Sequence, residues 1–174
     1  GLGDVYKRQE YKVRDLLENP NPTAAIYCKT GECEIRITAR AETDSSAEKM
    51  CRAYATKFYD LLGDAVYDED VTGLEETLVH TLKEKGLTIA TAESCTGGTI
   101  AARFTAMPGA SAYFKCGVVT YSLDAKQNFV NICCDTIARY GAVSEQVVRQ
   151  MAEGVRHLAN AHYAICLLYT SDAA

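Results

Sequence analysis

The sequence lacks tryptophan, has only three prolines and three histidines among its 174 residues, and contains no long apolar run. With so little proline and only 12 glycines, it leaves no room for a long flexible linker. No apolar run approaches the roughly 20 residues that a membrane-spanning helix requires. Residues 1–9 are polar and charged, unlike a secretory signal. We therefore expect a globular, cytoplasmic protein that does not bind a membrane.

Positive charge and metal-binding motifs are also scarce. The 18 basic residues are outnumbered by 23 acidic ones, and the resulting net charge of −5 argues against a general binder of nucleic-acid phosphates. Cysteine is abundant, with eight residues, but no two have C-x-x-C spacing and no histidine lies at a zinc-like interval from a cysteine pair. Since disulfides are rare in the cytosol, we expect free, mostly buried thiols and no metal site.

Residues 10–70 have the pattern of a small α+β module. Alternating apolar and polar residues from Cys33 to Ala41 predict a half-buried strand. Ser45 and Glu48 form a capping box, which predicts the start of a helix that ends at Gly63. The apolar stripe of that helix comprises Met50, Cys51, Tyr54, Phe58, Leu61 and Leu62. An acidic connector, residues 68–70, follows this module.

Residues 71–165 alternate between helical and strand-like patterns. Helices are predicted from the Thr72–Glu75 capping box to Gly86, over residues 99–106 and 124–130, and after Ser144. Short apolar strands are predicted over residues 87–92 and 116–121, and a further strand begins at residues 163–165. The alternation indicates an α/β domain. Residues 1–9 and 166–174 follow neither pattern, and we interpret both as non-native, adapter-derived tails.

The turn at residues 93–98 (ESCTGG) is the strongest candidate for a catalytic or binding site. Ser94 follows a predicted buried strand, and Gly97 and Gly98 precede a helix, so backbone amides and the helix dipole would converge there. Such a turn can present a nucleophile and stabilise an oxyanion or a phosphate. The same residues would also serve a purely structural turn with an N-cap, and local sequence alone leaves both interpretations open.

A serine nucleophile needs a base, and Lys126 is the best-placed candidate. His80, His157 and His162 fall on helices or at a turn, where surface or structural roles are expected. Tyr121 ends a predicted central strand and Lys126 begins the next element, so both can reach the sheet edge that carries Ser94. Desolvation can lower the pKa of a lysine enough for it to act as a base. Considered alone, an ordinary solvated lysine remains the alternative.

Four motifs occur in one order over some 90 residues: TAESCTGG at 91–98, GVVTYS at 117–122, AK at 125–126 and GAVSE at 141–145. Together they resemble the C-terminal domain of the CinA family, the nicotinamide mononucleotide deamidase. The resemblance implies a three-layer α/β amidohydrolase domain over residues 71–165, acting without metal or cofactor on a small nucleotide. It further implies that Ser94 is the nucleophile, Lys126 the base and Tyr121 an assistant, with Thr96, Gly97 and Gly98 at the substrate.

Residues 10–70 resemble the KH-like middle domain of full-length CinA proteins. Nucleic-acid-binding KH modules use a G-x-x-G loop, which is absent here, since the sequence has KTGE at residues 29–32. Eight basic residues stand against 13 acidic ones in this segment, which is unfavourable for reading phosphates. We expect a structural spacer that does not bind nucleic acid.

Family members continue past the last strand into a further loop, strands and helices. The resemblance therefore describes a truncated domain, and we expect this polypeptide to be inactive and prone to association, although the intact protein would be an active homo-oligomer. Two alternatives remain: a scaffold in a competence or damage response, and a non-catalytic module that binds a nucleotide phosphate at the Gly97–Gly98 helix start.

Overall fold

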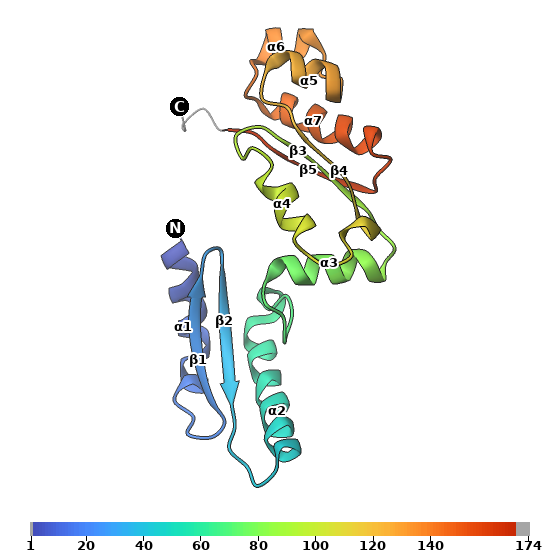
Figure 1. Cartoon of the computed structure of the whole chain (residues 1–174). Helices are drawn as coiled ribbons and strands as arrows, with labels where there is room; N and C mark the ends of the chain where they lie inside the picture. The colour runs from blue at the N-terminus through green and yellow to red at the C-terminus, as the bar shows by residue number, and fades with distance from the viewer. Residues whose placement is uncertain (1, 170–174) are drawn as a thin grey trace. The chain divides into compact units, whose positions relative to one another are not determined.

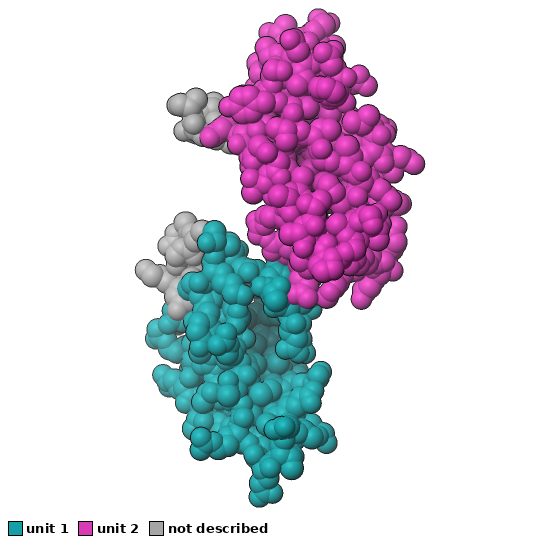
Figure 2. Space-filling model, in the orientation of Figure 1, with its two compact units in different colours: residues 1–74 teal, residues 75–174 magenta. Residues whose placement is uncertain are grey.

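The computed structural model describes the backbone of residues 2–169 and the side chains of residues 10–169. The chain forms two compact units, residues 1–74 and 75–174 (Figure 2). Five residues of the expected C-terminal tail, 170–174, lie outside the described part. None of the helices in the described part is both long and apolar enough to span a membrane.

Unit 1 is a β-hairpin packed against two helices (Figure 1). Its elements are α1 (Leu2–Leu17), β1 (Thr23–Lys29), β2 (Glu32–Thr38), α2 (Asp44–Leu62) and the 3₁₀ turn η1 (Gly63–Ala65). The strands pair antiparallel, with Ile26 opposite Ile35 and Cys28 opposite Cys33. Val13, Tyr54 and Phe58 form the buried core, and the Tyr54 hydroxyl donates to the Leu16 carbonyl at 2.7 Å, which ties α1 to α2.

Local signals located the elements of unit 1 only approximately. The strand expected from Cys33 is present as β2, and Gly63 ends α2 at a φ of +54°. The helix begins earlier than the Ser45–Glu48 capping box predicts, because Thr43 is the N-cap and accepts from the Ser46 amide. Strand β1 was not predicted, and α1 extends back to Leu2 through the segment interpreted as a tail.

Unit 2 is built on a parallel sheet of three strands in the order β4-β3-β5. These strands span Phe114–Val119, Ile89–Glu93 and Tyr163–Leu167 respectively. Both neighbours run parallel to β3, which is fully buried along its length. Strand β5 continues through Cys166 and Leu167, two residues past the domain end inferred from the sequence, because their backbones pair with Ala92 and Glu93.

Helices cover both faces of this sheet (Figure 1). On one face, α5 (Leu123–Val130), α6 (Cys134–Tyr140) and α7 (Glu145–Leu158) belong to a core that includes Ala90, Met151 and Val155. The other face has α3 (Leu74–Glu84), α4 (Thr99–Thr105) and the short turn η2 (Ala110–Ala112), around Val79, Phe104 and Tyr113. The predicted α/β class with a preceding α+β module is confirmed, whereas α6 was not foreseen.

All eight cysteines are free, as expected, but the expectation that most are buried is wrong. Cys28, Cys133 and Cys134 are exposed, and the other five are partly exposed. The expectation rested on the general tendency of free cysteines to be buried, which the individual positions in this chain do not follow.

Candidate active site

Ser94 lies at the carboxyl end of the central strand β3, where ligands bind in open α/β sheets. The ladder continues past the strand on both sides: the Thr120 amide donates to the Glu93 carbonyl at 2.8 Å, and the Ser94 amide donates to the Leu167 carbonyl at 3.1 Å. These bonds hold the backbone around Ser94 between both neighbouring strands. Its side chain is only 8% exposed.

Lys126 reaches Ser94 from the first turn of α5. Ser122 caps that helix, since its hydroxyl accepts from the Ala125 amide at 3.1 Å. The cap fixes where α5 begins, and this orients the lysine one turn later. The Lys126 side chain is 3% exposed, and its Nζ lies 3.2 Å from the Ser94 Oγ.

Two backbone carbonyls hold the lysine amine in place. Nζ donates to the carbonyl oxygens of Thr120 at 2.6 Å and Tyr121 at 3.2 Å, in addition to its contact with Ser94. A neutral amine has two N–H groups and one lone pair. When both N–H groups of neutral Lys126 bond to the carbonyls, its lone pair is left for the Ser94 hydroxyl at 3.2 Å and can accept the hydroxyl proton.

Burial lowers the pKa of Lys126 from the ordinary lysine value. Taking the ammonium out of water disfavours the charged form, and no described carboxylate makes an ion pair with Nζ that would offset this cost. Negative charge on Cys166 or Cys95 would act in the opposite direction, but burial is the larger effect. In turn, burial raises the pKa of Cys166 to about 11, so that thiol stays protonated at neutral pH.

Glu93 fixes the turn that carries Ser94. Its carboxylate is completely buried and accepts from the amides of Ile100 at 3.0 Å and Ala101 at 2.8 Å, in the first turn of α4. Burial alone would raise its pKa, but the hydrogen bonds that the carboxylate accepts, led by those from Ile100 and Ala101, together outweigh burial and lower the pKa. A charged side chain on β3 therefore fastens the start of α4 to the end of the strand.

The predicted substrate-binding residues form the turn between β3 and α4. Gly97 has a φ of +60° and donates from its amide to the Ser94 carbonyl at 3.2 Å, while Gly98 precedes α4 at a φ of +100°. Both conformations are accessible to glycine without strain. The amides of Cys95 and Thr96 make no hydrogen bond within the described part of the chain, so they remain available to a ligand.

The structure brings Ser94 and Lys126 together but not the Tyr121 hydroxyl. The Tyr121 side chain is 75% exposed, and only its backbone carbonyl contacts Lys126.

The histidines lie elsewhere. The Thr88 amide donates to His162 Nδ1 at 3.1 Å, and the Thr88 hydroxyl contacts the same nitrogen, at the opposite end of β3 from Ser94. Among the described residues, no three His, Cys, Asp or Glu side chains gather as a metal site would require.

Two residues that position the site were not predicted from the sequence. Thr120 acts through its carbonyl oxygen, which every residue has, so no sequence signal could identify it. Glu93 does leave a signal: an acidic residue at the end of an otherwise apolar strand, just before a turn into a helix. The preference of helix N-termini for carboxylates would have pointed to it.

Two family models match the chain. The model described as the CinA C-terminal domain matches residues 71–167, more than half of the chain. The model described as the damage-inducible protein CinA KH domain matches residues 9–67. These ranges cover the two compact units of the structure nearly end to end.

Curated relatives are similar over most of this chain. A CinA-like protein from Dictyoglomus thermophilum is 46% identical over 156 residues, covering 89% of this chain and 38% of the relative. A putative competence-damage inducible protein from Clostridium novyi is 46% identical over 155 residues, covering 88% of this chain and 37% of the relative. The chain thus spans less than two fifths of the length of these relatives.

Solved structures share the fold. Competence damage-inducible protein A from Klebsiella pneumoniae aligns with a TM-score of 0.53 at 35% identity, over 57% of this chain and 65% of that one. The competence/damage inducible protein CihA from Agrobacterium tumefaciens aligns with a TM-score of 0.53 at 37% identity, over 58% of this chain and 61% of that one.

Proposed function

Because the chain belongs to the CinA family, we propose that it is part of an amidohydrolase that converts nicotinamide mononucleotide to nicotinate mononucleotide and ammonia. The observation that carries the proposal is the buried contact of 3.2 Å between Lys126 Nζ and Ser94 Oγ. A buried lysine without an ion pair is costly to keep in a purely structural role. Next to a serine at a sheet edge, it has the arrangement of a nucleophile and its base.

The reaction would proceed through an acyl-enzyme. Neutral Lys126 takes the hydroxyl proton as Ser94 Oγ bonds to the carboxamide carbon of the substrate. The resulting ammonium then gives its proton to the amide nitrogen, the C–N bond breaks, and ammonia leaves. A water molecule, deprotonated by the same amine, attacks the ester carbon, and the proton returns to Ser94 Oγ as the carboxylate is released.

The amides of Cys95 and Thr96 would stabilise the oxyanion. They directly follow the nucleophile and make no hydrogen bond within the described residues. An amide next to the nucleophilic residue is the usual first donor of an oxyanion hole in strand–turn–helix sites. Removing one such donor in other enzymes costs about a hundred- to a thousandfold in rate.

The phosphate-binding alternative at the Gly97–Gly98 helix start is less favoured. Glu93 already occupies the Ile100 and Ala101 amides, and its negative charge would repel an anion there. A scaffold without activity would have no need of a buried Ser–Lys contact. Lys126→Ala should abolish turnover if the protein is an enzyme, but should spare binding if it is a pure binder.

The test is ammonia release from nicotinamide mononucleotide. We would assay this chain and a chimera that continues past Leu167 with the corresponding segment of the Dictyoglomus thermophilum relative. Ser94→Ala and Lys126→Ala are each expected to lower turnover about a thousandfold or more, since nucleophile and base act as one unit. Ser111→Ala and Lys115→Ala, on exposed side chains of the same unit, are the matched controls. A folded chimera that releases no ammonia would contradict the proposal.

A further inference from the structure

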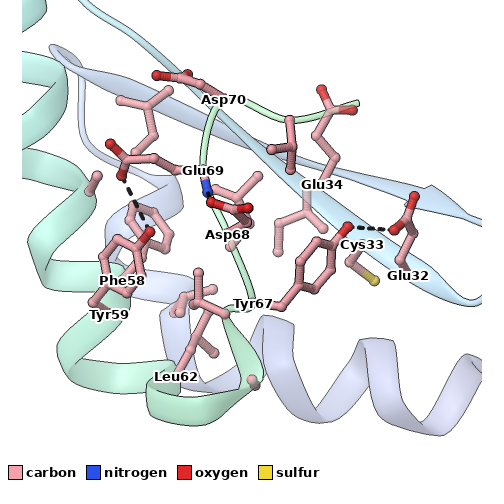
Figure 3. A pocket seen from close by; sticks show the side chains of 18 of the residues that line it. Glu32, Cys33, Glu34, Phe58, Tyr59, Leu62, Tyr67, Asp68, Glu69 and Asp70 are labelled. Carbon is pink, nitrogen blue, oxygen red and sulfur yellow. Dashed lines mark hydrogen bonds between the residues drawn. The ribbon is translucent and has the colours of Figure 1, made fainter. Parts of the chain in front are cut away.

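Unit 1 contains a cavity that the proposed reaction does not use. It has a volume of about 420 Å³ and lies between β2, α2 and the connector that follows η1, residues 66–73 (Figure 3). Its volume falls within the range typical of sites for small organic ligands. The inner wall is apolar, with Ile35, Ile37, Phe58 and Leu62 among the lining side chains.

Carboxylates dominate the polar part of the lining. Six acidic residues and two basic ones line the cavity. Both cations are already paired within it: Lys29 with Glu34 at 2.7 Å, and Arg52 with Glu48 at 2.8 Å. The other four carboxylates make no ion pair with any described side chain; they are Glu32, Asp68, Glu69 and Asp70.

Neutral donors hold three of these four carboxylates in position, and for Asp68 the donor is the Glu69 amide at 2.9 Å. The Tyr67 hydroxyl donates to Glu32, and the Tyr59 hydroxyl donates to Glu69 at 3.3 Å, as the dashed lines in Figure 3 show. Burial, followed by the bond to Glu32, raises the pKa of Tyr67 to about 12. Both phenols therefore orient a carboxylate at neutral pH without cancelling its charge. The four carboxylates without an ion pair lie on two sides of the cavity, Glu32 on β2 and the other three on the connector.

We propose that this cavity binds a linear aliphatic polyamine. The methylene segments of such a molecule match the apolar wall, and its separated ammonium groups match carboxylates on two sides of the opening. Anions, including nucleic acid, would be repelled by the four unpaired carboxylates. A monoamine would neutralise only one of them. A compact divalent cation needs at least three converging ligands, and no such group exists among the described residues.

Calorimetric titration of the full chain with spermidine tests the proposal. We expect one molecule to bind unit 1, with amide NMR shifts centred on Cys33, Ala55 and Val66 in the cavity lining. Asp68→Asn with Glu69→Gln is expected to weaken binding about tenfold or more, since it removes two carboxylates from the opening. Glu42→Gln with Asp60→Asn is the matched control, because it removes the same charge from exposed positions outside the cavity and is expected to leave binding unchanged.

Magnesium chloride distinguishes a site from general attraction to an acidic protein. We expect magnesium to bind at least about tenfold more weakly than spermidine and to shift no amide signal in the cavity. Equal loss of spermidine binding in the two double variants, equal affinity for magnesium, or no binding at roughly millimolar spermidine would each overturn the proposal. None of these outcomes depends on Ser94 or Lys126, so the deamidase proposal stands or fails separately.

Discussion

Lys126 illustrates how burial and local donors determine what a single residue can do. In water its ammonium would hold its proton well above neutral pH. In unit 2 the side chain is buried, its acceptors are the uncharged carbonyls of Thr120 and Tyr121, and burial lowers its pKa. The sequence identified the residue, but its environment comes from β4 and α5 folding back on β3.

We predict that Lys126 titrates below the ordinary lysine value of 10.5. The unfolded chain then binds more protons than the folded one between the two pKa values, so the free energy of unfolding should rise with pH across that interval. Titration of the lysine Cε resonance by NMR measures the midpoint, and loss of the signal in Lys126→Met assigns it. A midpoint at or above 10.5 would remove the physical basis for a lysine base.

At the scale of elements, the turn between β3 and α4 depends on Glu93. A chain of four residues, Cys95 to Gly98, connects Ser94 to a helix of only seven residues. Such a short helix has little stability of its own. The bonds from Ile100 and Ala101 to the buried carboxylate therefore fix the helix start, and with it the amides of Cys95 and Thr96.

Glu93→Gln is expected to destabilise unit 2 by about 1–3 kcal/mol at neutral pH. The charge-assisted hydrogen bonds become neutral ones, and the NH2 group of the glutamine faces a backbone N–H donor of Ile100 or Ala101. Folding lowers the pKa of Glu93. The contribution of its charge is therefore fully present above the pKa of the unfolded chain, about 4.3, and is lost as the pH falls through the pKa of the folded protein. The difference in unfolding free energy between the two proteins should therefore shrink at acidic pH.

Denaturant unfolding at several pH values measures this effect, with the exposed Glu153→Gln as the matched control. A pH-independent difference between Glu93→Gln and the parent protein would mean that the side chain acts by shape rather than by charge.

Elements with strong local signals were the ones that the sequence located. Helix α7 begins directly after Ser144, as predicted, because the Ser144 hydroxyl accepts from the Val147 amide. Strand β1 and helix α6 carry no comparable alternation or cap, and they form because β2 and α7 offer surfaces to pack on. Tertiary contacts override weak local preference in such segments.

At the scale of the whole molecule, the two units have separate cores. Val13, Tyr54 and Phe58 form the buried centre of unit 1, and the two clusters of unit 2 draw only on residues after position 75. Each unit thus contains the apolar side chains that stabilise it. This arrangement agrees with the two family models, which match the units one by one.

We predict that Phe58→Ala destabilises unit 1 by about 3–5 kcal/mol and leaves unit 2 protected. Phe58 is buried and packs edge-on against Tyr54, with ring centroids 5.7 Å apart. Amide hydrogen exchange should show faster exchange in β1 and β2 and unchanged exchange in β3. Phe129→Ala, at an exposed phenylalanine of unit 2, should alter neither. Equal loss of protection in β3 would show that the units unfold together.

The sequence by itself determined the class of the fold, the order of most elements, and Ser94 and Lys126 as the candidate pair, because these depend on periodicity, caps and motifs within short segments. Only the tertiary structure decided that Thr120 and Tyr121 hold Lys126 through their carbonyls, that the Tyr121 hydroxyl points away, and that Glu93 fastens α4. It also created the acidic cavity of unit 1. These features are distances between residues far apart in the chain, and only packing brings such residues within a few ångströms of one another.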